Sequence, residues 1–143
     1  MNTLQANISN IETVESLNIV SFNVSGTPLK MMSLELSNDV KVGRDVLLSI
    51  KPTHIVLAKK SSTISYHDSL SLSNFLEAKI DSFEVGTLLS SVTLEYNNEK
   101  LEAIITTESF NKLDLKHHDN NDETIIMMFQ ASELSIYKLL ENS

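Results

Sequence analysis

The stretch NTLQANI at residues 2–8 recurs as NFLEAKI at residues 74–80, with Asn, Leu, Ala and Ile at matching positions. The two copies also close alike, because VLLSIKPT at residues 46–53 aligns with IIMMFQAS at residues 125–132. The offset is 72 residues at the start and 79 at the end, so the second copy carries a seven-residue insertion. The sequence therefore predicts two tandem copies of one structural unit.

Within each copy, apolar residues alternate with polar ones, a period of two that is typical of strands with one buried face. The alternating positions are Leu4, Ala6, Ile8, Val20, Phe22, Val24, Val46, Leu48 and Ile50, then Leu76, Ala78, Ile80, Val92, Leu94, Tyr96, Leu101, Ala103, Ile105, Ile125, Met127 and Phe129. Turn residues lie between these runs at 25–28 and 97–99. Four or five short strands per copy predict a small closed barrel of the OB type.

Other segments complete the predicted organisation. The inserted residues 108–115 have Phe110 and Leu113 at helical spacing, which predicts one or two helical turns. The last segment, residues 132–140, could be a terminal helix, but its alignment with the strand at 54–57 favours a strand. We expect an all-β chain with a divergent first barrel at 1–60, a serine-rich linker at 61–72 and a second barrel at 73–143.

Composition excludes several classes of function. The 143 residues contain no cysteine, which excludes disulfides and thiolate chemistry and agrees with a reducing cytoplasm. A net charge of −8 disfavours binding to nucleic acid or to anionic membranes. The N-terminal residues 1–5 do not read as a signal peptide, and no apolar run is long enough to span a membrane. We expect a soluble, cytoplasmic protein whose small halves gain stability by forming a homo-oligomer.

No residue pattern supports an enzyme. Neither His54 nor His67 has a nucleophile and an orienting group at a recognisable spacing. His117, His118 and Asp119, with Asp122, could suggest a metal site, but a solvated polar loop is the favoured interpretation. The methionine pairs at 31–32 and 127–128 are interpreted as core residues.

Four segments of the second copy follow one another along the chain, namely SLSNFL at 71–76, IITTES at 104–109, LDLK at 113–116 and QAS at 130–132. In the order and spacing of these segments, the second copy resembles the molybdate-binding Mop (TOBE-type) domain family. In that family the corresponding segments read Ser-Ala-Arg-Asn, Ile-Thr-x-x-Ser, Leu-Gly-Leu and Lys-Ala-Ser. The resemblance spans residues 71–137 and extends to residues 2–58 through the internal repeat.

Two fused copies resemble the di-Mop arrangement of small cytoplasmic molybdenum-storage proteins. The resemblance implies two tandem five-stranded barrels that exchange strands, anion sites at interfaces, and a homo-oligomer, with a trimer favoured. The ligand it implies is molybdate or tungstate, held as an oxyanion without coordination of the metal by the protein. Because the chain begins directly with the first barrel, we expect the storage type rather than a DNA-binding repressor. The alternative is an interaction or effector-sensing module of the same fold with lost or weakened oxyanion binding.

The resemblance also implies the residues of the oxyanion site. They are Ser71, Ser73, Thr106, Ser109, Gln130, Ala131 and Ser132 of the second copy, with Lys51 of the first. Hydroxyl and amide donors suit a tetrahedral dianion, since each hydrogen bond to a charged group contributes about 1.5–3 kcal/mol. The chain departs from the pattern at Ser73 and Gln130, where the family has Arg and Lys, and at Pro52, which lacks a backbone donor. Read without the resemblance, these Ser and Thr residues are ordinary residues of turns and strand ends.

Overall fold

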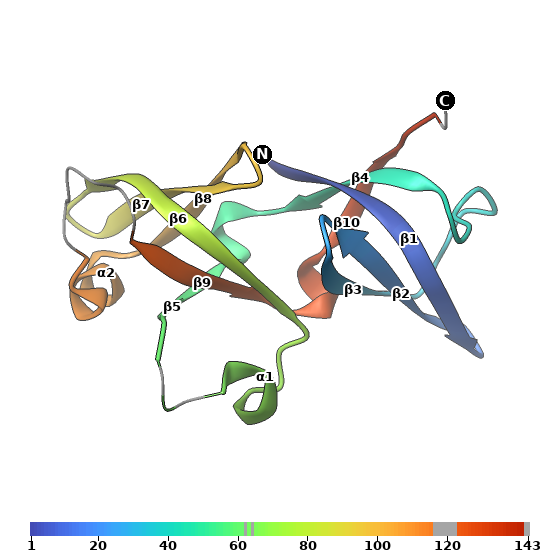
Figure 1. Cartoon of the computed structure of the whole chain (residues 1–143), viewed down its shortest axis with the longest axis horizontal. Coiled ribbons are helices and arrows are strands. Elements are labelled where there is room, and N and C mark those ends of the chain that lie inside the picture. Colours follow the sequence, from blue (N-terminus) through green and yellow to red (C-terminus); the bar gives the residue numbers. More distant parts are fainter. Residues whose placement is uncertain (62, 64, 116–122, 142–143) are drawn as a thin grey trace.

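The computed structural model describes residues 1–61, 63, 65–115 and 123–141, and Figure 1 shows their arrangement. Strands dominate the described residues, as the sequence predicts. They are β1 (Asn2–Val14), β2 (Leu17–Val24), β3 (Thr27–Ser33), β4 (Asp45–Ile50), β5 (Val56–Lys59), β6 (Asn74–Val85), β7 (Leu89–Tyr96), β8 (Glu99–Thr106), β9 (Thr124–Phe129) and β10 (Ser135–Leu139). The helical segments are α1 (Tyr66–Ser69), α2 (Thr107–Leu113) and the 3₁₀ turns η1 (Pro52–His54) and η2 (Ala131–Glu133).

The strands form two antiparallel sheets that lie side by side (Figure 1). One sheet has the order β10-β4-β1-β2-β3 and the other the order β5-β9-β6-β7-β8. The last strand of each repeat is hydrogen-bonded into the sheet of the other repeat, since β10 pairs with β4 and β5 pairs with β9. This mostly β arrangement is consistent with the expected OB-like architecture.

The internal repeat is visible in the positions of the elements. β6, β7 and β8 each begin 72 residues after β1, β2 and β3, whereas β9, η2 and β10 each begin 79 residues after β4, η1 and β5. The extra residues therefore lie between β8 and β9. This segment contains α2, so the predicted helical turns of the insertion are confirmed. The final segment is the strand β10 rather than a helix, as its alignment with residues 54–57 predicts.

The first strand of each repeat bends and pairs with two neighbouring strands. Residues 2–7 of β1 pair with β4, and residues 7–14 pair with β2. A bulge at Ile8/Asn10 separates the two ladders, and β6 has the equivalent bulge at Ile80/Ser82. A bulge bends a strand and increases its twist, which allows one strand to contribute to both sides of a small curved sheet.

The alternating apolar residues of both repeats form one continuous core. Its largest fully buried side chains are Phe22, Phe129, Leu4, Ile8, Leu29, Leu48, Leu76, Leu94, Leu101, Ile125, Met127 and Val20. The predicted period of two is therefore confirmed in both sheets. The prediction for the methionine pairs is wrong at one position, because Met32 is 43% exposed while Met31, Met127 and Met128 are buried. Met32 and Met31 are adjacent on β3, so their side chains point to opposite faces.

Two buried asparagines fasten each sheet to the other. Asn74 accepts a hydrogen bond from the Lys30 backbone nitrogen (2.7 Å) and donates one to the Lys30 carbonyl oxygen (2.9 Å). Asn2 makes the equivalent pair with Glu102, at 2.8 Å and 2.7 Å. Each side-chain amide thus occupies the place of a further strand at the free edge of β3 or β8, where backbone groups need partners.

The hairpin turns of the two repeats also meet. Ser25 and Gly26 connect β2 to β3, and Asn97 and Asn98 connect β7 to β8, all four with positive φ. Such two-residue turns match the right-handed twist of paired strands. The Asn97 amide donates to the Ser25 hydroxyl at 2.6 Å, and the Tyr96 hydroxyl lies 2.9 Å from the Thr27 hydroxyl oxygen. Turn residues at equivalent positions therefore join the repeats.

The serine-rich segment predicted as a linker contains the single helical turn α1 between Ser65 and Leu70. The hydroxyl of Tyr66 donates to the carbonyl oxygen of Lys59, which ties this turn to the end of β5. Across the described residues, no helix is long and apolar enough to cross a membrane.

Replacing Asn74 with alanine should lower the free energy of unfolding by about 2 kcal/mol, because the Lys30 backbone groups lose both partners. Urea unfolding followed by circular dichroism measures this difference. The control is Asn111→Ala on the exposed face of α2, which should change stability by less than about 0.5 kcal/mol. Equal stability of the two variants would contradict the role assigned to Asn74.

Candidate functional site

The structure divides the predicted site residues between two places. The first, called here the η2 cluster, consists of Ser73, Gln130, Ala131 and Ser132, with Ser71 two residues before Ser73 in the chain. Asn74 on β6 lies opposite Phe129 on β9, so Ser73 and Gln130 directly flank the last pair of this ladder. Gln130 precedes η2 in an extended conformation, and η2 packs against β3 of the first repeat.

The second place, called here the η1 cluster, consists of Thr53, Thr106 and Ser109, with Lys51 two residues before Thr53 in the chain. Lys51 precedes η1 just as Gln130 precedes η2, and η1 packs against β8 of the second repeat. Thr53, Thr106 and Ser109 line one groove. The structure thus brings Thr53 of one repeat together with Thr106 and Ser109 of the other, whereas neither Lys51 nor Ser132 lines that groove.

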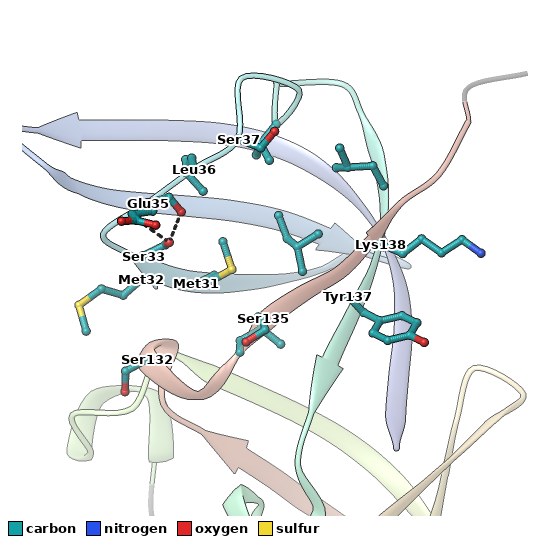
Figure 2. Close-up of a pocket in the computed structure, with 14 residues that line it drawn as sticks. Met31, Met32, Ser33, Glu35, Leu36, Ser37, Ser132, Ser135, Tyr137 and Lys138 are labelled. Carbon is teal, nitrogen blue, oxygen red and sulfur yellow. Dashed lines mark hydrogen bonds between the residues drawn. The ribbon is translucent and has the colours of Figure 1, made fainter.

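A groove accompanies each cluster. The η1 groove, of about 460 Å³, is lined by Thr53, residues 55–57 and 104–106, Ser109, Lys112 and Leu113. The η2 groove, of about 480 Å³, is lined by residues 31–33, 35–37 and 134–139, with Val40 and Ser132 (Figure 2). Thr53 and Ser132 occupy equivalent positions of the repeat, and so do β5 and β10. The two grooves are therefore equivalent sites in the two halves of the molecule.

Thr106 and Ser109 have a local structural role. Thr106 is the N-cap residue of α2, where its hydroxyl oxygen accepts a hydrogen bond from the Ser109 backbone nitrogen at 3.1 Å. The same hydroxyl donates to the Ser109 hydroxyl oxygen at 2.9 Å. The Ser109 hydroxyl hydrogen is not used in this pair, so Ser109 can donate to a ligand while Thr106 fixes its orientation.

The two turns differ in the donors that they offer. Pro52 begins η1 and has no backbone N–H, whereas Ala131 at the equivalent position of η2 has one. Lys51 gives η1 a positive charge, while Gln130 gives η2 a neutral amide whose oxygen lies 3.4 Å from the Ser132 hydroxyl. The turn η1 therefore has the positive charge but lacks the backbone donor, whereas η2 has the backbone donor but lacks the charge.

One contact between the turns escaped the sequence reasoning. His54 ends η1 and Glu133 ends η2, at equivalent positions of the repeat, and His54 Nδ1 lies 2.7 Å from Glu133 Oε2. The N–H direction is not aligned for a hydrogen bond, so the contact becomes an ion pair when His54 is protonated. The alignment of HIVL at residues 54–57 with ELSI at residues 133–136 shows that His54 and Glu133 are equivalent positions. It does not show that η1 and η2 are in contact.

Two ionisable groups near the hairpin turn of the second repeat have shifted pKa values. Partial burial beside Leu4 and Val24 raises the pKa of Glu99, because it disfavours the charged carboxylate. A hydrogen bond to Asp81 raises the pKa of Lys100, with the attraction of the same carboxylate as the second cause. Both residues lie outside the two clusters.

The possible metal site suggested by the sequence at His117, His118, Asp119 and Asp122 lies outside the described residues. Within the described part of the chain, no three His, Asp or Glu side chains gather closely enough to hold a metal ion. The described site therefore offers hydroxyl, amide and ammonium donors to a ligand.

No family model matches the chain, and no curated protein sequence matches it. Among solved structures, the chain is similar to the cytoplasmic molybdate-binding protein ModG in a crystal form with molybdate bound. The TM-score is 0.79 and the sequence identity 21%, and the similarity covers 94% of this chain and 93% of the other. The chain therefore shares the fold of that protein over nearly the whole length of both.

Glu99→Gln should stabilise the protein at neutral pH. Because folding raises the pKa of Glu99 above its ordinary value of 4.5, stability present below that pH is lost as the pH rises through the raised value. The amide removes this loss, so the variant should exceed the native protein by less than about 1 kcal/mol at pH 7 and match it near pH 3. Thermal unfolding at both pH values measures the difference, and the exposed Glu12→Gln is the charge-matched control. A gain of the same size in Glu12→Gln would show that total charge is responsible.

Thr106→Ala should destabilise the protein by about 1 kcal/mol through loss of the α2 cap, whereas Thr106→Ser should retain most of the stability. Urea unfolding of the two variants separates capping from the loss of a methyl group. If the serine variant is as unstable as the alanine variant, the hydroxyl contributes nothing to the cap.

Proposed function

We propose that this protein binds a tetrahedral oxyanion of the molybdate or tungstate type and serves in intracellular molybdenum storage or buffering. The observation that carries the proposal is the similarity of fold, over 94% of the chain, to a protein that binds molybdate. The donor chemistry of the two clusters supports it, because hydroxyl and backbone N–H groups can hold a tetrahedral dianion without ligating its metal.

Attraction of the anion must come from donors in direct contact with it, because the protein as a whole is negatively charged. The net charge of −8 gives an anion no general attraction, and charges beyond about 8–10 Å are screened at physiological salt. Ser73 and Gln130 replace the two cations of the family pattern, so affinity should be lower by about one order of magnitude for each 1.4 kcal/mol lost. Lys51 places one cation at the start of η1.

The expected assembly belongs to the same proposal. The pairing of β10 with β4 and of β5 with β9 supports strand exchange between the copies. We propose residues 1–60 and 73–143 as sequence units joined by the linker 61–72, with each unit's sheet completed by the other. A trimeric homo-oligomer in the cytoplasm, without nucleic acid or membrane partners, completes this picture.

The second candidate is an interaction or effector-sensing module that keeps the fold with weakened oxyanion binding. Three departures from the family pattern favour it, namely Ser73, Gln130 and Pro52. Affinity for the oxyanion distinguishes the two candidates.

Calorimetric titration with molybdate, tungstate, sulfate and phosphate tests the proposal. Molybdate and tungstate should bind at millimolar concentration or below. Gln130→Lys should strengthen this binding by about tenfold because it restores a charge-assisted hydrogen bond, and Ser132→Ala should weaken it by a similar factor.

The control is Ser82→Ala, an exposed serine of β6 outside both clusters, which should leave affinity unchanged. Absence of molybdate and tungstate binding in both the native protein and Gln130→Lys would overturn the oxyanion proposal in favour of the interaction module.

A further inference from the structure

The η1 groove is much larger than the ion proposed for it. A tetrahedral oxyanion occupies roughly 120 Å³, taking about 30 Å³ for each of its four water-sized oxygens. The groove measures about 460 Å³, which falls within the range of pockets for small organic ligands. A bare oxyanion would therefore contact only part of its lining.

Polar groups enter the groove from one face of α2. Thr106, Ser109 and Lys112 follow one another at a spacing of three, which places them on the same side of a helix. The opposite side of α2 is anchored by buried Phe110, whose ring centroid lies 5.0 Å from that of Phe83. The core therefore fixes the helix with its polar row toward the groove, where Thr53 of η1 adds another hydroxyl.

Apolar side chains form the rest of the lining. They come from residues 55–57 at the start of β5 and from Ile104 and Ile105 at the end of β8. Val56, on the edge strand β5, is 48% exposed. Among the lining residues that the structure describes, Lys112 carries the only charge. The groove thus combines one cationic, hydroxyl-bearing wall with an apolar wall.

The equivalent η2 groove has the opposite character. Leu34 occupies the position that corresponds to Thr106, and the carboxylate of Glu35 lines the groove. Lys138 also borders it, but its side chain points to the side away from Glu35 and Ser33 (Figure 2). The two halves have therefore diverged in the charge that they present at the same place in the fold, and the η1 groove has a lysine in its lining without a carboxylate beside it.

We propose that the η1 groove binds an organic oxyanion, with a phosphate- or sulfonate-like head on an apolar body about the size of a ring system. The head lies against Thr53, Ser109 and Lys112, and the body lies against Ile104, Ile105 and residues 55–57. This inference rests on the proposed oxyanion site and deepens it by naming the class of ligand. Burial of the body adds affinity that the few charged groups cannot supply alone.

The test uses the full chain and the probe 8-anilinonaphthalene-1-sulfonate, with N-phenyl-1-naphthylamine as the matched neutral probe. Fluorescence titration should give saturable binding of the sulfonate that Lys112→Met weakens by about tenfold, while the neutral probe is little affected. Lys138→Met, at the lysine that borders the η2 groove, is the matched control and should leave both affinities unchanged. Lys112→Gln should reproduce the effect of Lys112→Met.

Amide chemical shifts provide the location. Sulfonate-induced changes at residues 55–57 and 104–113 support the proposal, whereas changes confined to residues 31–37 overturn it. Equal sulfonate affinity in Lys112→Met and in the native protein also overturns it.

A parallel molybdate titration separates this inference from the proposed function. Molybdate binding without Lys112-dependent sulfonate binding overturns the inference alone. Lys112-dependent sulfonate binding without molybdate binding supports the organic ligand and overturns the molybdate proposal.

Discussion

The reciprocal pairing of the last strands is the constraint on which the rest of the structure depends. β4 and β9 each have one edge occupied by the leading strand of their own repeat, and the backbone groups of the other edge need partners. β10 and β5 supply those partners from the opposite repeat. Neither repeat completes its sheet alone, so the two halves share one core and cannot unfold independently without exposing a strand edge.

This crossing determines where the candidate site residues lie. The chain must pass from one sheet to the other at η1 and again at η2, so these turns lie where the repeats meet. Thr53 consequently lies beside Thr106 and Ser109 of the other repeat, and His54 reaches Glu133. The divergent first repeat thereby contributes its own closing turn to the groove that contains the helix of the second.

The two halves share a backbone plan but differ in chemistry. Equivalent asparagines fasten both sheets, and equivalent bulges bend both leading strands. The segment after the third strand differs, with α2 and Lys112 in one half and Leu34 and Glu35 in the other. Among the described residues of this segment, Phe110 is buried in the core, whereas Leu36, Val40, Leu113 and Leu115 are only partly buried against it. The segment is therefore less constrained by the shared core than the strands are.

The sequence by itself determined the repeat, the strands, the position of the helix and most of the core. These features depend on local spacing. Alternation of apolar and polar residues with a period of two indicates a strand with one buried face, and the extra residues of the second repeat must lie between strands that both repeats share. Only the tertiary structure decided which repeat completes each groove, because strand edges pair through backbone groups that every residue type carries. For that reason the family resemblance placed Thr106 and Ser132 in one oxyanion site, whereas the fold separates them into two grooves and brings Thr106 together with Thr53.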